Sequence, residues 1–106
     1  MITDKKMENA LDYLVKTDKD YAEKRAEVDV IEHRMDISNS QGFLHAEGIS
    51  EERKSKAKTT DEYRELVDRY RDARTEMEIM ATRRRTAELI IEVWRTESAN
   101  RRKRNI

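Results

Sequence analysis

The sequence predicts an all-α fold, a long antiparallel helical hairpin of the coiled-coil type with a short connecting helix. The chain has no proline and only two glycines, and the stretch from Thr60 to Ile106 contains neither. Apolar residues recur every three or four positions in both halves, which places them on one stripe of a helix. Charged residues make up 43% of the chain. This share is well above that of an average soluble domain, so narrow helical seams are a more plausible core than a round interior.

The first helix is predicted over residues 3–47. The hydroxyl of Thr3 is suited to cap its first amides, and Asp4 suits the positive end of the helix dipole. Gly48 is expected to end the helix in a left-handed backbone conformation. Poor helix formers at residues 38–42 leave open whether the helix is continuous there. The predicted seam of this helix comprises Leu11, Leu14, Tyr21, Val28 and Met35.

The second half is predicted to hold a short helix over 50–58, with Ser50 as its N-cap, and a long helix over 60–100. Thr59 and Glu62 have the spacing of a capping box at the start of the long helix. Residues 101–106 are predicted to be a basic tail. The predicted seam of the long helix comprises Tyr63, Leu66, Tyr70, Met77, Met80, Ile91 and Trp94.

The short connector predicts which parts of the two long helices face each other. With antiparallel helices ending near 46 and starting near 60, the numbers of facing residues should sum to about 106. This places Trp94 against Leu11 and Leu14, with Ile91 beside them. It also places Val28 near Met77 and Met80, and Met35 near Tyr70.

Arg84 is the one polar interruption in the seam of the second helix. The same register places it opposite Asp18 or Asp20, where the first helix also has a charged residue instead of an apolar one. An ion pair within a seam adds little net stability but can specify register. We therefore predict that Arg84 and Asp18 form a register ion pair.

A hairpin of two helices buries little surface, and the flanks of both seams carry further apolar residues. Self-association by two-fold symmetry into a four-helix bundle would cover them. The sequence therefore predicts a homo-oligomer, with a dimer favoured.

Residues that carry chemistry are sparse. There is no cysteine, no glycine-rich phosphate loop and no nucleophile elbow, and His33 and His45 lie too far apart to form a metal pair on one turn. We expect no enzymatic activity, no cofactor, no metal and no small-molecule substrate. No apolar run is long enough to span a bilayer and the N-terminus does not resemble a signal peptide, so we expect a cytoplasmic protein without a membrane partner.

The charge balance and the basic end bear on nucleic acids. The chain has 23 basic and 23 acidic residues, which argues against bulk polyanion binding and against an acidic DNA mimic. Four successive cations near the C-terminus could contact phosphates, and they equally suit the negative end of a helix dipole. These candidate phosphate contacts are Arg101, Arg102, Lys103 and Arg104.

Two segments of the chain, Phe43–Gly48 followed by Glu51–Lys54 and the later Thr86–Arg102, resemble small all-helical accessory proteins of tailed bacteriophages. The resemblance implies a phage protein from an early gene region near recombination and single-strand-binding functions. It implies no catalytic or binding residues. The leading hypothesis is a non-enzymatic protein that binds a protein partner of phage DNA recombination or replication. The alternatives are direct DNA binding through the basic tail and a purely structural coiled-coil module.

Overall fold

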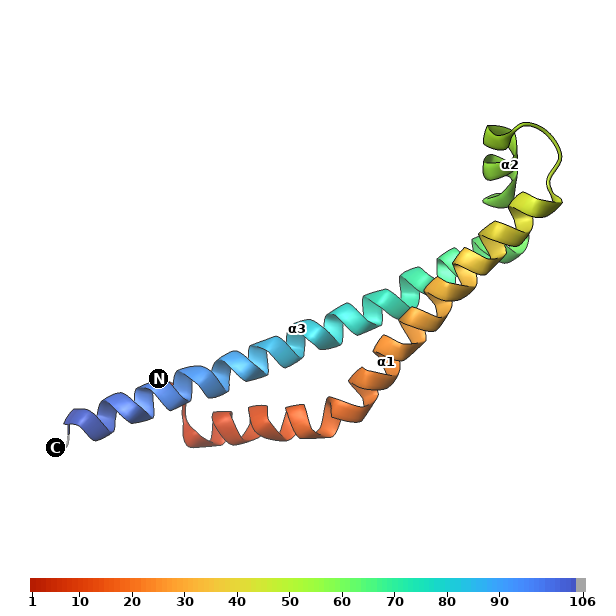
Figure 1. The fold of residues 1–106 in the computed structure, drawn as a ribbon. Helices are drawn as coiled ribbons and strands as arrows, with labels where there is room; N and C mark the ends of the chain where they lie inside the picture. Colours follow the sequence, from red (N-terminus) through yellow and green to blue (C-terminus); the bar gives the residue numbers. More distant parts are fainter. Residues whose placement is uncertain (105–106) are drawn as a thin grey trace. The chain divides into compact units, whose positions relative to one another are not determined.

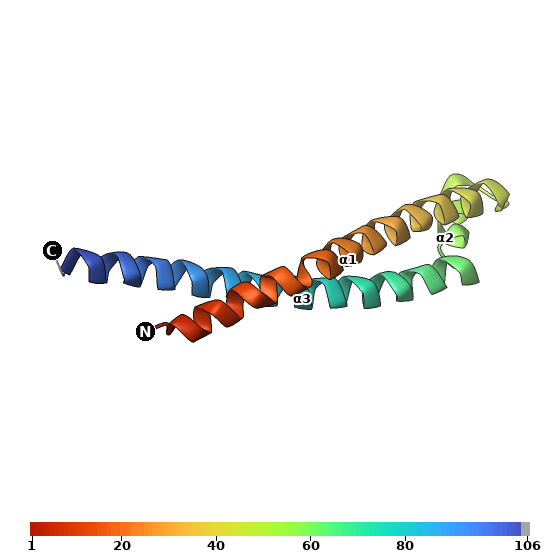
Figure 2. The ribbon, with the colours of Figure 1, turned by 90° about the horizontal axis from the view of Figure 1, so that it is seen from below.

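The computed structural model describes residues 1–104 and contains three helices: α1 (Asp4–His45), α2 (Ser50–Ala57) and α3 (Asp61–Arg104). The two long helices pack side by side and antiparallel, with α2 between them in the chain (Figures 1 and 2). The predicted all-α hairpin with a short connecting helix is therefore confirmed. The chain forms two compact units, which are described separately: unit 1 joins Met1–Ala22 to the chain from Glu78 onward, and unit 2 is Glu23–Met77.

Helix α1 begins and ends close to the predicted residues. The hydroxyl of Thr3 accepts a hydrogen bond from the Lys6 amide at 3.1 Å, as expected of a capping residue. The helix runs without a break through residues 38–42 and ends at His45 instead of residue 47. Gly48 then adopts a φ of +115°, a conformation that residues with a side chain rarely take.

Gly42 has a packing role that the sequence did not reveal. A Cβ atom at this position would lie 2.9 Å from the Cα atom of Ala57, which is fully buried. The missing side chain therefore allows α2 to pack directly against the last turns of α1. Arg53 strengthens this contact, because its Nε donates to the Phe43 carbonyl at 3.0 Å and its guanidinium lies 4.3 Å from the centre of the Phe43 ring.

Two predicted caps are wrong by one residue. Helix α2 has Ile49 at the N-cap with no side-chain hydrogen bond, so Ser50 is its first residue and not its cap. At the start of α3 it is Thr60 whose hydroxyl accepts a hydrogen bond from the Tyr63 amide, at 3.2 Å. The hydroxyl of Thr59 instead donates to the Lys56 carbonyl at 2.8 Å, at the end of α2.

Unit 2 has a small apolar core between the second half of α1 and the first half of α3. Ile31 is 1% exposed and packs in a cluster with the other apolar residues of both helices, namely Val28, Met35, Tyr70, Ala73 and Met77. Val28 with Met77, and Met35 with Tyr70, therefore meet in one cluster, as the register predicted. An ion pair at its edge joins Lys24 to Glu76 at 2.7 Å.

Among the described residues of unit 1, the buried apolar side chains are both alanines. Ala10 of α1 is 6% exposed and Ala87 of α3 is 5% exposed, whereas Leu11 is 50% exposed. The prediction that Leu11 lies in the seam is therefore wrong. Ala10 and Leu11 point about 100° apart around the helix axis, and the structure turns the smaller residue inward. Small inward residues let the two helices approach closely but leave the larger apolar side chains outside.

Candidate protein-interaction site

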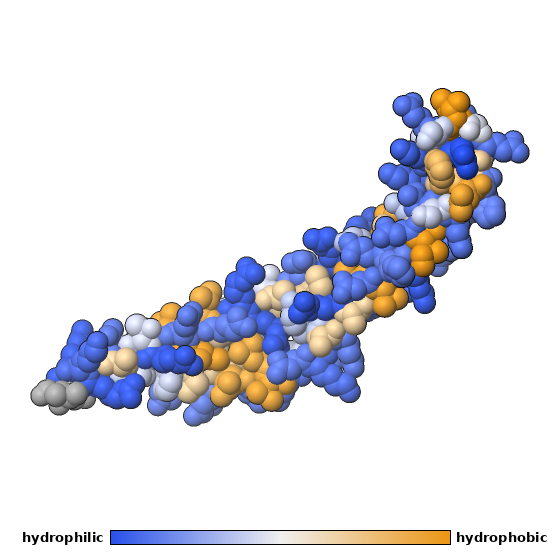
Figure 3. All heavy atoms as spheres, in the orientation of Figure 1, coloured by the Kyte–Doolittle hydropathy of each residue, from blue (hydrophilic) through white to orange (hydrophobic). Residues whose placement is uncertain are grey.

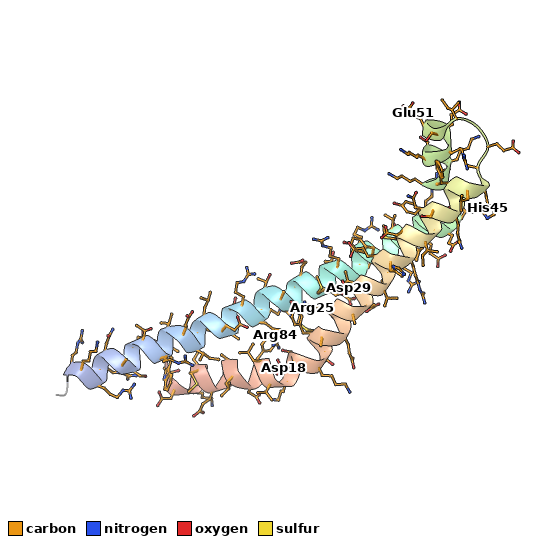
Figure 4. All side chains as sticks on the ribbon, viewed as in Figure 1. Asp18, Arg25, Asp29, His45, Glu51 and Arg84 are labelled. Atoms are coloured by element: carbon orange, nitrogen blue, oxygen red, sulfur yellow. The ribbon has the colours of Figure 1, made fainter. Side chains whose placement is uncertain are left out.

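Arg84 joins α3 to α1 in unit 1 through several polar contacts. Its guanidinium donates to the Leu14 carbonyl at 2.9 Å and to the Thr17 hydroxyl at 2.6 Å. It also forms a salt bridge with Asp18, and the two side chains point toward each other in Figure 4. The ring of Tyr21 lies 5.2 Å from the guanidinium carbon.

The burial of Arg84 and of its partners shows how these contacts fix the register of α1 and α3. The Arg84 side chain is 14% exposed and that of Asp18 is 67% exposed. The arginine is therefore largely buried in the seam between the two helices, and the carboxylate lies at the solvent-exposed edge of that seam. The predicted pairing with Asp18 is present, and the hydrogen bonds to Thr17 and Leu14 were not foreseen. Because the acceptors are specific atoms on α1, the cluster specifies how the two helices meet.

The other predicted seam residues are mostly in place. Val28 and Leu66 are buried, and half-buried positions are held by Leu14, Tyr21, Met35, Tyr63, Tyr70, Met77, Met80, Ile91 and Trp94. The indole N–H of Trp94 donates to the Asp4 carboxylate at 2.8 Å, about two helical turns before Leu11, which the register had placed opposite it. The Ile2 amide likewise donates to Glu97 at 2.9 Å. The register estimated from the predicted helix ends therefore fails at this end of the hairpin.

Beside the seam of unit 1 lies an open groove of about 410 Å³. Its walls come from α1 and α3, and Ala10, Tyr13, Ala87 and Ile90 give it an apolar lining. The cations Lys6 and Arg83 also line it. Figure 3 shows apolar side chains gathered over unit 1 among hydrophilic ones.

Helix α3 continues this apolar surface beyond the groove. Ile79, Leu89 and Val93 are 48%, 52% and 45% exposed. They are the large exposed apolar residues of α3 among the described residues, and all three belong to unit 1. Sequence reasoning expected apolar residues on the flanks of the seam but did not identify Ile79 or Leu89. The signal that could have revealed them is their spacing, because the intervals from Ile79 to Leu89 and from Leu89 to Val93 are sums of three- and four-residue steps.

The predicted basic tail is the last turn of α3. Arg101, Arg102, Lys103 and Arg104 are helical and exposed, whereas residues 105–106 of the predicted tail lie outside the described residues. Successive residues of a helix point about 100° apart, so these four cations surround the helix end instead of forming one flat patch. They lie at the negative end of the α3 dipole, where cations are stabilising.

Within residues 1–104 no three His, Cys, Asp or Glu side chains are grouped so that they could hold a metal ion. Asp12 accepts a hydrogen bond from Lys16 one turn later and thereby raises the pKa of that ammonium group. This pair is an exposed contact along one face of α1, with a distance of 2.8 Å.

Comparisons with protein-family models, curated proteins and solved structures gave no match for this chain. The resemblance to phage accessory proteins therefore stays a prediction. None of the helices described over residues 1–104 combines the length and the apolar character needed to cross a membrane.

Proposed function

We propose that this chain is a non-enzymatic accessory protein that binds other proteins through the apolar surface of unit 1. The observation that carries the proposal is the exposure of large aliphatic side chains there, with Leu89 52% exposed and Val93 45% exposed beside an open apolar groove. In a chain with 43% charged residues, apolar side chains gathered on one surface favour a contact that removes them from water.

The cellular setting belongs to the same proposal. The resemblance of Phe43–Gly48 and Thr86–Arg102 to phage accessory proteins supports a role in a phage-infected cell, with a recombination or replication protein as the partner. The groove adds a chemical requirement, because Lys6 and Arg83 lie at its walls. An amphipathic helix with acidic residues beside its apolar stripe would match both the groove and these cations.

A matched pair of substitutions tests the proposal. Leu89→Glu places a carboxylate on the apolar surface of unit 1, and Val30→Glu does the same on α1 in unit 2 at the same 52% exposure. Each tagged chain is purified from the native host and the co-purified proteins are quantified. We expect a protein recovered with the wild type and with Val30→Glu to be reduced at least about tenfold with Leu89→Glu, because a charge would be desolvated in the contact.

Comparison with the Val30→Glu control also shows which result would contradict protein binding through unit 1. Circular dichroism should confirm equal helix content in the three chains, so that a lost partner does not simply report unfolding. The same set and amount of co-purified proteins from all three chains would contradict binding through this surface.

Nucleic-acid binding is a second candidate, favoured by the four exposed cations in the last turn of α3. We expect Arg102→Gln combined with Lys103→Gln to weaken binding to a labelled single-stranded oligonucleotide at about 50 mM salt. Each lost phosphate contact should also reduce the slope of log affinity against log salt by about 0.7. Fluorescence anisotropy at several salt concentrations measures both quantities.

The control for the basic turn removes two exposed cations elsewhere, Lys54 and Lys58, by the same change to glutamine. An equal loss of affinity in the control would indicate a general charge effect. No binding by the wild-type chain at about 50 mM salt would rule the candidate out, because phosphate contacts are strongest at low salt.

A further inference from the structure

Helix α3 carries a second, exposed stripe beside its seam with α1, and two of its members, Thr82 and Thr86, also line the groove. Its members follow one another at alternating intervals of three and four residues, the spacing of the inner positions of a coiled coil. All of them belong to unit 1, and none is charged. The stripe comprises Ile79, Thr82, Thr86, Leu89, Val93 and Thr96.

The threonine hydroxyls of this stripe turn back onto α3. The Thr82 hydroxyl donates to the Glu78 carbonyl at 2.9 Å, the Thr86 hydroxyl to the Thr82 carbonyl at 3.1 Å, and the Thr96 hydroxyl to the Glu92 carbonyl at 3.1 Å. Each hydroxyl is thus satisfied within its own helix. What these side chains offer to a neighbour is β-branched and apolar, like Ile79 and Val93.

We propose that a second copy of this chain covers the stripe, with its own α3 packed antiparallel to the first about a two-fold axis. The inference rests on the proposed function, because it names a partner for the same surface. In the antiparallel arrangement the stripe of one copy packs against the same stripe of the second copy. Thr82 then faces Val93 of the second copy, and Thr86 faces its Leu89. Each layer then combines a threonine with a larger aliphatic residue, which fills space better than layers of paired threonines.

The charges beside the stripe select the antiparallel direction. Arg85 and Glu92 flank the layer formed by Thr86 and Leu89, so the two-fold axis brings each Arg85 beside Glu92 of the other copy, twice. In the parallel direction Glu92 would lie beside Glu97 of the second copy. The cationic last turns of the two α3 helices would also lie together, at a cost in repulsion.

Cysteine cross-linking of the full chain tests this arrangement, and the natural chain has no cysteine to interfere. Thr82→Cys and Val93→Cys are made as separate variants and oxidised alone and as a mixture. In the antiparallel dimer, two cysteines face each other only when one chain carries Thr82→Cys and the other carries Val93→Cys. Identical positions are about 16 Å apart along the axis, beyond the ~7 Å reach of a disulfide. We expect a disulfide-linked dimer from the mixture, at least about fivefold above either variant alone.

Two further measurements make the outcome decisive. Sedimentation of the purified wild-type chain at about 100 µM should show a species of twice the 12.7 kDa chain mass. That species should be lost in Leu89→Glu and kept in Val30→Glu. A third cysteine variant, Val30→Cys, reports cross-linking by random collision.

Each other outcome overturns the inference. Cross-linking of each variant with itself at a level at least equal to that of the mixture would show a parallel dimer. A monomer at this concentration with only collisional cross-linking would exclude the second copy as the partner. These experiments use the purified chain alone, so the inference can fail while a host protein is still lost from Leu89→Glu, and the proposed function would then stand with a different partner.

Discussion

Replacing Arg84 by alanine is expected to lower the free energy of unfolding by about 2–3 kcal/mol. The substitution removes hydrogen bonds to the Leu14 carbonyl and the Thr17 hydroxyl from a side chain that is only 14% exposed. It also removes the contact with the Tyr21 ring and leaves a gap in the seam of unit 1. Urea denaturation followed by circular dichroism measures the change.

The matched controls separate the inward hydrogen bonds from the ion pair. Asp18→Asn removes the charge partner but keeps the bonds to Leu14 and Thr17, and the Asp18 side chain is 67% exposed. We therefore expect it to cost less than about 1 kcal/mol. Arg64→Ala removes an exposed arginine elsewhere on α3 and should change the stability by no more than about 0.5 kcal/mol. Equal losses for Arg84→Ala and Asp18→Asn would contradict the role given to the inward bonds.

Replacing Gly42 by alanine is expected to destabilise the end of the hairpin by about 1–3 kcal/mol. In most helix interiors the same change is favourable by about 0.5–1 kcal/mol, because glycine loses more backbone freedom on folding. Here the new Cβ atom would lie 2.9 Å from the Cα atom and 3.0 Å from the Cβ atom of Ala57, so α2 must move away. Hydrogen exchange of the α2 amides and urea denaturation would both report the change.

Ser40→Ala is the control for this prediction, because Ser40 is exposed two residues earlier on the same helix. It should leave the exchange of α2 unchanged and should be neutral or slightly stabilising. A gain in stability for Gly42→Ala, with α2 as protected as in the wild type, would show that the close approach to Ala57 is unimportant.

Much of the hairpin could be predicted because helical periodicity is a local property. The spacing of Val28, Met35, Leu66 and the other seam residues identifies one face of each helix without knowledge of its partner. The Thr3 cap follows from chemistry within one turn of the chain. The pairing of Arg84 with Asp18 was accessible because each interrupts an apolar seam, and polar interruptions in facing seams tend to meet.

The candidate interaction surface was only partly accessible from the sequence. A self-associating surface was expected from the flanks of the seams, but its members on α3, Ile79 and Leu89, were overlooked. Half of the six positions of that stripe are threonines, and these make it look polar in the sequence. Only the structure shows that the hydroxyls of Thr82, Thr86 and Thr96 turn back onto their own helix.

The sequence by itself determined that the chain forms two long helices with a short one between them, and which broad face of each helix turns inward. Only the tertiary structure decided that Ala10 rather than Leu11 lies inside, that Trp94 meets Asp4, and that Gly42 admits α2 instead of breaking α1. The physical reason is that the periodicity of apolar residues indicates which side of a helix faces inward only to within about 100°, the angle between successive residues. It does not indicate which residues of the two helices lie opposite each other along their axes. This pairing depends on contacts between residues far apart in the chain.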